Sequence, residues 1–206
     1  MDSTKTADRI CECKCSYKKK AGRLTLVIGC MFASKSTILI SEIKKFMRKK
    51  KKCIVINNAR DTRYGDNVVA THDGVVLKAE KCSSLREVYD KMKDADVIGI
   101  DEIHFFPVED IEIIKEMLKA GKILIICGLN GSFEQTPFEI VSRLIPFASK
   151  IVHVTALCSI CSEDGAAFTL KKAGGEKPSG KPPESLFDVG NDDKYIAICS
   201  ECMFNM

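Results

Sequence analysis

The stretch Leu26-Val-Ile-Gly29-Cys-Met-Phe-Ala-Ser34-Lys35-Ser36-Thr37 decides the fold of this chain. An apolar strand leads into a turn, and the turn ends in Lys-Ser-Thr at the start of a helix. This is the layout of a phosphate-binding loop, G-x-x-x-x-G-K-[ST], whose backbone N–H groups face the phosphates. Ser34 stands where the pattern has its second glycine, and its Cβ lies where backbone and phosphate normally approach closely. The stretch predicts a nucleotide-binding α/β fold with one departure in the loop.

The expected nucleotide contacts in this loop form one continuous run. Lys35 would reach the β- and γ-phosphates of a nucleotide as a point charge, and the Ser36 hydroxyl would ligate Mg²⁺. The run consists of Gly29, Cys30, Met31, Phe32, Ala33, Ser34, Lys35 and Ser36.

A second motif, Val97-Ile-Gly-Ile-Asp101-Glu102-Ile-His104, is an apolar strand that ends in two acids. Asp101 is in the position to hold Mg²⁺ through water at a strand end that faces the phosphate loop. Glu102 is a candidate general base, which is required if the phosphoryl acceptor is a hydroxyl group. His104 either contacts nucleotide or forms a hydrogen bond within the turn.

Strands and helices alternate along residues 23–155, which favours a mostly parallel sheet covered by helices on both faces. Ligands of such sheets bind at the carboxyl ends of the strands. The expected strands are 23–29, 53–57, 96–100, 123–127 and 150–155, and the expected helices are 37–50, 84–93, 108–120 and 137–144. A capping box, Ser84-Leu-Arg-Glu87, opens the second helix, and residues 61–74 are expected to form a polar loop.

The chain has 11 cysteines, an odd number, and its N-terminal segment has no apolar stretch typical of a secretory signal. This usage favours a reducing, cytoplasmic compartment in which thiols are free or bound to metal. Free thiols are expected at Cys30, Cys53, Cys82 and Cys127. Cys11, Cys13 and Cys15 lie in a polar arm, residues 1–22, that is expected to be disordered.

Two C-x-x-C pairs near the C-terminus predict a closed, structural zinc site, because four thiolates on two short knuckles form the tetrahedral set that Zn²⁺ prefers. The four ligands are Cys158, Cys161, Cys199 and Cys202. A long Gly/Pro/Lys-rich insertion separates the pairs. The domain prediction is therefore an arm over residues 1–22, an ATP-binding domain over 23–155 and a zinc-binding domain over 156–206.

Composition supports an ordinary globular protein without a membrane segment. The 206 residues carry a net charge of +4, with 45% hydrophobic and 29% charged residues, and no apolar run approaches the ~20 residues that span a bilayer. The lysine runs at 18–20 and 49–52 are interpreted as solvated surface, so no nucleic-acid partner is expected.

Five motifs in the same order resemble the type II, cytosolic thymidine kinase family. GCMFASKST resembles the family pattern GPMFSGKST; ARDTRY with THD resembles DTRY…THD; DEIHFF resembles DE-x-Q-F-F; and GLNGSF resembles GLDGTF. The segment from Cys158 to Cys202 resembles the family's zinc-and-lasso segment. The resemblance covers nearly the whole chain. Its departures include Ser34 for Gly, Cys30 for Pro, and His104 for Gln.

The resemblance implies a RecA-like domain with a small zinc-ribbon and lasso domain, and transfer of the γ-phosphoryl of ATP to the 5′-hydroxyl of thymidine, with deoxyuridine as a further candidate. It implies catalytic roles for Glu102, Lys35 and Arg63, with magnesium held by Ser36 and Asp101. Nucleotide contacts would extend to Asp61, Thr62, Arg63, Asp101, Glu102, Ile103 and His104. The nucleoside would be enclosed by Met31, Asp61, Leu129, Phe133, Thr169 and Tyr195 and by the lasso Leu186, Phe187, Asp188, Val189 and Gly190. The family's usual assembly is a homotetramer, and its usual control is feedback by thymidine triphosphate.

Interpretations from other classes stay open at this point. Asp101-Glu-Ile-His104 matches the D-E-x-H box of helicases, although a helicase motor needs two such domains and one takes up most of this chain. A degenerate nucleotide-binding zinc-ribbon module is the other alternative; Ser34 favours it and the intact Glu102 opposes it. Met31 and Phe133 are also typical of simple core positions, and Tyr195 of packing on the zinc ribbon.

Overall fold

The computed structural model describes residues 21–61, 68–70, 75–172 and 194–205. The strands are β1 (Arg23–Gly29), β2 (Cys53–Asn58), β3 (Val68–Ala70), β4 (Val76–Lys78), β5 (Glu80–Cys82), β6 (Val97–Ile100), β7 (Ile123–Leu129), β8 (Lys150–Val154), β9 (Phe168–Lys171) and β10 (Tyr195–Ile198). The helices are α1 (Lys35–Arg48), α2 (Tyr89–Asp94), α3 (Asp110–Lys119), α4 (Glu139–Leu144) and α5 (Ser200–Phe204), with short 3-10 turns η1 (Leu85–Val88), η2 (Ile103–Phe105) and η3 (Ile145–Phe147).

Six strands form one sheet in the order β5-β2-β6-β7-β1-β8, and every neighbouring pair in it is parallel. The parallel α/β sheet predicted from the alternation of elements is therefore confirmed. All five predicted strands lie in it, with ends that differ from the prediction by one residue at most, except that β7 continues two residues further, to Leu129.

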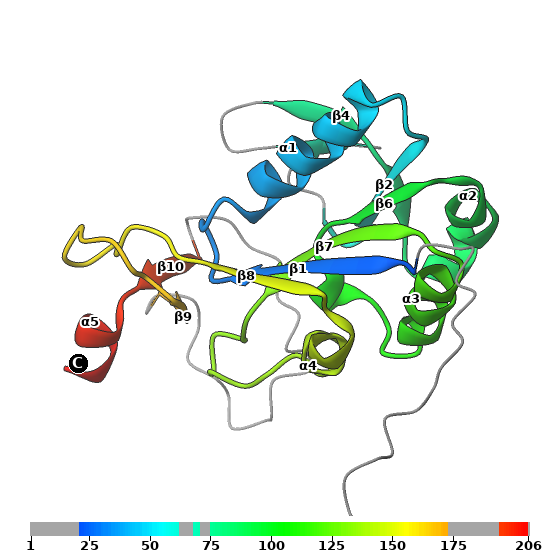
Figure 1. Cartoon of the computed structure of the whole chain (residues 1–206). Helices are drawn as coiled ribbons and strands as arrows, with labels where there is room; N and C mark the ends of the chain where they lie inside the picture. The colour runs from blue at the N-terminus through cyan, green and yellow to red at the C-terminus, as the bar shows by residue number, and fades with distance from the viewer. Residues whose placement is uncertain (1–20, 62–67, 71–74, 173–193, 206) are drawn as a thin grey trace, which may run out of the picture.

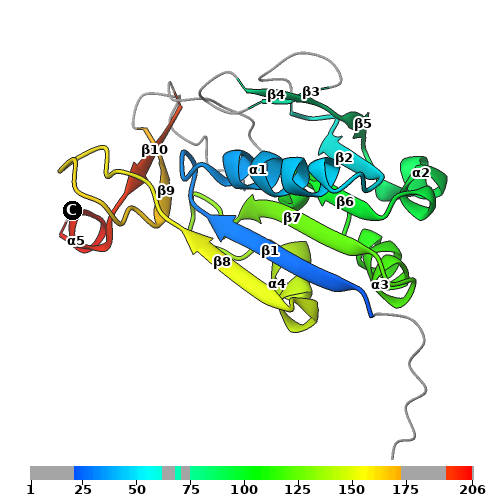
Figure 2. The same ribbon diagram turned by 45° about the horizontal axis from the view of Figure 1, so that its top comes forward.

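Helices cover both faces of this sheet, as Figures 1 and 2 show. On one face α1 buries Leu39, Ile40 and Ile43 against alternate strand residues such as Val27 and Val55. On the other face α2, α3 and α4 bury a larger cluster. Each central strand is buried on both sides, which explains why its sequence is an apolar run without polar alternation.

Several local expectations need correction. Residues 61–74 are not entirely loop, since β3 lies within them and pairs with β4 in a small antiparallel ribbon. β5 extends the main sheet beyond β2 and was not predicted. Three-residue strands are too short to show a period in sequence.

Helix starts also differ from the prediction. The capping box at Ser84 and Glu87 is confirmed, but it opens the 3-10 turn η1, which then passes into α2. α4 begins at Glu139 rather than at Pro137, with Phe138 as its extended N-cap residue. α1 begins at Lys35, two residues earlier than predicted, because the phosphate loop leads directly into the helix.

β9 and β10 form an antiparallel ribbon; Cys158 and Cys161 lie before β9, and Cys199 and Cys202 follow β10 at the start of and within α5. The boundary between the predicted domains at residues 155 and 156 is not a gap in packing. One buried cluster contains Cys30 and Ala33 of the phosphate loop together with Cys158, Ala197 and Ile198 of the C-terminal segment. The predicted division into domains stays a prediction.

Candidate active site

The carboxyl ends of β1, β6 and β7 meet at one edge of the sheet. Ile126 of β7 lies opposite both Leu26 of β1 and Ile100 of β6. The three strands are therefore in register just before the loops that carry the predicted site residues. Gly29, which starts the phosphate loop, pairs with Leu129. The loop after β1 and the acids after β6 are therefore brought to the same edge, on either side of β7.

The phosphate loop has a left-handed backbone at two positions without glycine. Phe32 has φ 64° and Ser34 has φ 54°. Ser34 is the N-cap of α1, but its side chain makes no capping hydrogen bond and is exposed. The departure from glycine is therefore accommodated in the left-handed conformation that glycine adopts at low cost.

Lys35 is the first residue of α1, and its side chain is buried beneath the loop. Its Nζ donates a hydrogen bond of 2.5 Å to the carbonyl oxygen of Cys30. Burial lowers the pKa of Lys35, and the negative charges of Glu102 and Asp101 oppose that shift. An ammonium held inside the loop, beside two carboxylates, fits the binding of a phosphate group.

The acids after β6 are held in a tight turn. Asp101 is 3% exposed, and its Oδ1 accepts a hydrogen bond of 3.0 Å from the backbone N–H of Glu102. Glu102 adopts a left-handed backbone, φ 50°, at the N-cap of η2 and is 7% exposed. The oxygen donors of Asp101 and Ser36 match the hard ligands that Mg²⁺ prefers, and the adjacent Lys35 marks where the phosphates would lie.

His104 lies in η2, the 3-10 turn that follows Glu102, and is 3% exposed. Its Nδ1 accepts a hydrogen bond of 3.3 Å from the backbone N–H of Leu129 and lies 3.5 Å from Oε2 of Glu102. Its Nδ1 therefore links the end of β7, through this hydrogen bond, with the turn that begins at Glu102.

Four of the residues predicted to enclose the nucleoside make contacts where the phosphate loop and the loop after β7 meet β9–β10. The backbone N–H of Met31 donates to Oγ1 of Thr169 at 3.0 Å. The rings of Phe133 and Tyr195 are 6.1 Å apart between centroids. Thr169 and Tyr195 are each 4% exposed, so both also contribute to the core of the ribbon. Leu129 follows at the end of β7.

Two side chains that the sequence analysis did not single out hold the loop after β7 against the C-terminal segment. Asn130 Nδ2 donates to the carbonyl oxygen of Ala167 at 2.9 Å, and Gln135 Nε2 donates to that of Thr169 at 3.1 Å. Gln135 has φ 61°, the left-handed conformation. A polar loop residue alone gives no sequence signal for a partner more than 30 residues away.

Asp61 is buried at the end of β2, at the same edge of the sheet. Its Oδ2 accepts a hydrogen bond of 3.0 Å from Nδ2 of Asn57, and its carbonyl oxygen accepts one of 2.8 Å from Nζ of Lys81. Asn57 was not identified from the sequence. Thr62, Arg63, the lasso at residues 186–190 and the cysteines at positions 11, 13 and 15 lie outside the described residues.

Cys158, Cys161, Cys199 and Cys202 converge, with all four sulfur atoms within 4.8 Å of one another. Tetrahedral zinc with Zn–S bonds of about 2.3 Å places sulfurs about 3.8 Å apart, and the Cys161 and Cys199 sulfurs are separated by 3.8 Å. Hydrogen bonds from backbone N–H groups lower the pKa of Cys158 to about 6, and the largest effect comes from the N–H of Cys161. The cluster therefore fits zinc.

The cysteines expected to be free are confirmed as unpaired: Cys30, Cys53, Cys82 and Cys127. Cys30 Sγ donates to the carbonyl oxygen of Ala166 at 3.0 Å, which joins the phosphate loop to the segment before β9. Burial raises the pKa of the Cys30 and Cys127 thiols. Both are therefore protonated near neutral pH and act as small packed donors rather than as nucleophiles.

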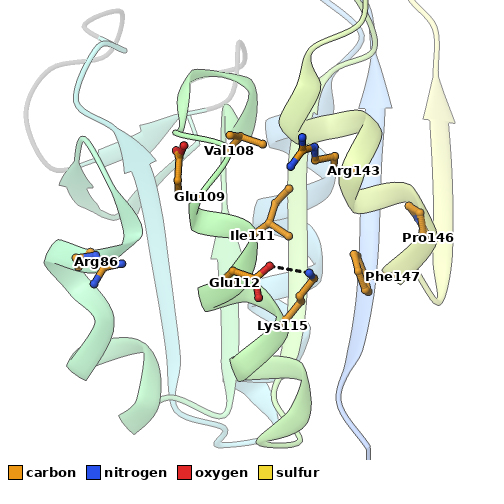
Figure 3. Close-up of a pocket in the computed structure, with 9 residues that line it drawn as sticks. All are labelled: Arg86, Val108, Glu109, Ile111, Glu112, Lys115, Arg143, Pro146 and Phe147. Carbon is orange, nitrogen blue, oxygen red and sulfur yellow. Dashed lines mark hydrogen bonds and ion pairs between the residues drawn. The ribbon is translucent and has the colours of Figure 1, made fainter.

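A cavity of about 540 Å³ lies on another part of the surface, beside α3 and α4 (Figure 3). Its lining residues are Arg86, Val108, Glu109, Ile111, Glu112, Lys115, Arg143, Pro146 and Phe147. None of them is a predicted site residue, so the cavity is separate from the nucleotide site.

The parallel sheet, the phosphate loop with buried Lys35, and the acid pair at the neighbouring strand end define a P-loop nucleotide-binding protein with a cysteine site fit for zinc. The thymidine kinase family model matches residues 22–203. The chain belongs to the thymidine kinase family. It is therefore a nucleoside kinase, and the family resemblance of the sequence is confirmed.

Individual relatives agree over most of the chain. A thymidine kinase of Myxoma virus (strain Uriarra) is 38% identical over 183 residues, which are 89% of this chain and 97% of the relative. Thymidine kinase 1 of Dictyostelium discoideum is 36% identical, over 88% of this chain and 78% of the relative. The cytosolic thymidine kinase of Homo sapiens is 36% identical, over 92% of this chain and 76% of the relative. Among solved structures, flagellar accessory protein FlaH from Methanocaldococcus jannaschii aligns with a TM-score of 0.49 at 13% identity over 71% of this chain and 76% of that one.

Proposed function

We propose that this protein transfers the γ-phosphoryl group of ATP to the 5′-hydroxyl of thymidine and so forms thymidine monophosphate. The observation that carries the proposal is the burial of Lys35, Asp101 and Glu102 at one sheet edge in a chain of the thymidine kinase family. A lysine among two acids suits phosphates and Mg²⁺, and a glutamate next to them suits removal of a hydroxyl proton.

In this proposal Lys35 binds the β- and γ-phosphates, while Ser36 and Asp101 hold Mg²⁺, which neutralises charge on the phosphates when bound. Glu102 accepts the proton of the 5′-hydroxyl while the hydroxyl oxygen forms a bond to the γ-phosphorus. The bond from that phosphorus to the bridging oxygen breaks, and ADP leaves with the electron pair. Phosphoryl transfer needs mostly positioning and charge stabilisation, which the buried site supplies.

Nucleoside binding is assigned to the space between the phosphate loop and the C-terminal ribbon. Met31, Leu129, Phe133, Thr169 and Tyr195 would enclose the thymine base, supported by the Met31–Thr169 hydrogen bond and the Phe133–Tyr195 ring contact. By resemblance, Asp61, Thr62 and Arg63 would face the sugar and phosphates. The lasso, residues 186–190, would close over the base edge; only Asp61 of these lies within the described residues.

The wider properties of the enzyme are also proposals. Deoxyuridine is a second candidate substrate, and thymidine triphosphate is the candidate feedback inhibitor. A homotetramer is proposed from the family resemblance; the edge strand β8 and exposed Ile151, Ile145 and Phe147 supply apolar surface for contact between copies. Unpaired cysteines support a reducing, cytoplasmic location. Among the described residues no helix is both long and apolar enough to cross a membrane.

The direct test is incubation of purified protein with Mg-ATP and thymidine, beside the Ser34→Gly and Glu102→Gln variants, with measurement of thymidine monophosphate. Product from the wild type and from Ser34→Gly, but little from Glu102→Gln, is expected. Product from Ser34→Gly alone would make the natural chain a degenerate kinase. Absence of product from every variant, with the protein folded and zinc bound, would overturn the proposal in favour of a non-catalytic binding module.

A further inference from the structure

We infer that His104 is a positioning residue that holds the general base Glu102 in register with the nucleoside-binding loop after β7. This inference rests on the proposed kinase function. His104 stands where the resembling family pattern carries glutamine, so the device belongs to this chain. Nδ1 of His104 lies between the turn that begins at Glu102 and Leu129 at the end of β7.

The imidazole of His104 packs against two aromatic rings. Its centroid lies 4.2 Å from that of Phe105 and 4.9 Å from that of Phe138, with tilted planes in both cases. The side chain is 2% exposed. A buried ring packed in this way has little freedom to turn, so its nitrogen atoms keep their directions.

The hydrogen bond to Leu129 fixes the tautomer of His104. A backbone N–H can only donate, so Nδ1 must be the accepting nitrogen, and in the neutral ring the hydrogen is then on Nε2. The same Nδ1 lies 3.5 Å from Oε2 of Glu102. Because Nδ1 accepts from Leu129, it has no proton to offer that carboxylate, so His104 positions Glu102 through the turn that the two residues share, η2 with Glu102 as its N-cap.

Close packing next to this hydrogen bond also holds the turn after Glu102 against the end of β7. A Cβ on Gly128 would lie 2.7 Å from Cγ2 of Ile103, so the turn after Glu102 sits directly against the backbone of β7. The left-handed backbone of Glu102 starts that turn. The Glu102 turn and the end of β7 are therefore one rigid unit, in which His104 supplies the polar connection.

The functional consequence follows from what lies at each end of this unit. Glu102 is the proposed base, and Leu129 and Phe133 form part of the proposed wall of the nucleoside site. Because proximity effects are steep, a shift of about 1 Å between base and hydroxyl can cost about 100-fold in rate. Loss of the Nδ1 acceptor should lower kcat and raise KM for the nucleoside. KM for ATP, which is proposed to bind at Lys35, should change little.

The test compares His104→Phe, which keeps a ring without an acceptor, with His104→Asn, whose Oδ1 can stand close to the position of Nδ1. His153→Phe on the exposed strand β8 is the matched control. His104→Phe should lower kcat by about 10- to 100-fold with KM for ATP within about twofold of wild type. His104→Asn should recover most of the loss, and the control should match wild type.

Nitrogen NMR of the wild-type protein gives a readout that does not depend on activity. An unprotonated Nδ1 at neutral pH, and a shift of the Leu129 amide resonance in His104→Phe but less in His104→Asn, are expected. A protonated Nδ1, an unchanged kcat in a folded His104→Phe, or absence of rescue by asparagine would overturn the inference. Inactive wild-type protein with the expected NMR result would instead count against the proposed function.

Discussion

Ser34 shows how one residue can change a phosphate loop without removing it. Its side chain is exposed, and its strain lies in the backbone, where φ is 54° and ψ is 28°. For a residue with a Cβ this conformation costs about 1–2 kcal/mol. Lys35 and Ser36, the proposed functional residues of the loop, follow immediately in α1 and keep helical positions.

Replacement of Ser34 by glycine should raise the free energy of unfolding by about 0.5–1 kcal/mol, because relief of strain exceeds the entropy that glycine adds to the unfolded chain. Urea denaturation measures this change. Ser41→Gly in the interior of α1 is the matched control and should destabilise by roughly 0.5 kcal/mol. Equal losses in both variants would show that Ser34 is not strained.

Lys35→Met tests both the activity and the stability that depend on this charge. Loss of the ammonium should lower kcat by about 100- to 1000-fold, whereas the relief of Lys35 desolvation is offset in the fold by the loss of its hydrogen bond to Cys30 and of its charge beside Asp101 and Glu102. Because the folded-state pKa of Lys35 is lowered, its charge destabilises the protein at low and neutral pH, and that penalty disappears as pH rises from the folded pKa toward about 10.4. Denaturation at several pH values should show this rise in the wild type and its loss in Lys35→Met.

Among the elements, the capping box before α2 does more than start a turn. Ser84 Oγ accepts from the N–H of Arg86 and also donates to Oδ1 of Asp110 at 2.8 Å, and Asp110 Oδ2 accepts from the N–H of Leu85. The cap therefore ties η1 to the first turn of α3. Burial raises the pKa of Asp110, while these hydrogen bonds oppose the shift.

Ser84→Ala should destabilise the protein by about 1–2 kcal/mol, since it removes a cap and one hydrogen bond to a partly buried carboxylate. Thermal or urea unfolding measures the loss. Ser83→Ala, one residue earlier with an exposed side chain, should change stability by less than about 0.5 kcal/mol. A loss in Ser84→Ala no larger than in this control would contradict the linking role.

At the scale of the whole molecule, the zinc-binding segment and the phosphate loop share one packed cluster. Cys30 and Ala33 lie in it with Cys158 and Cys199, and Cys30 also donates its hydrogen bond to Ala166. The proposed metal site and the proposed nucleotide site are therefore joined by direct packing and a hydrogen bond. A structural zinc that orders the C-terminal ribbon should also steady the loop that binds phosphate.

Chelation of zinc, or Cys199→Ser, should lower Tm by roughly 5–10 °C and weaken ATP binding by about 2- to 30-fold. Metal analysis, thermal unfolding and calorimetric titration with ATP check the three parts. Cys53→Ser, at a cysteine outside the cluster, should retain zinc and ATP affinity. Full ATP affinity in zinc-free, folded protein would show that the two sites are independent.

The sequence by itself determined the features that depend on neighbouring residues. Apolar runs predicted five of the six strands of the main sheet, and residues 29–36 predicted the phosphate loop. The paired cysteines indicated the metal site, and Asp101-Glu102 indicated the acids. Each of these signals is local, because strand burial, loop chemistry and C-x-x-C spacing are written in consecutive residues.

The tertiary structure alone decided which distant groups meet. The short strands β3 to β5, the contact of His104 with Leu129, and the hydrogen bonds of Asn130 and Gln135 to the C-terminal segment have no periodic signal. Their partners are set by strand order and by packing across the sheet, which a linear pattern does not contain. For the same reason only the fold revealed that the C-terminal cysteine segment packs against the loop after β1.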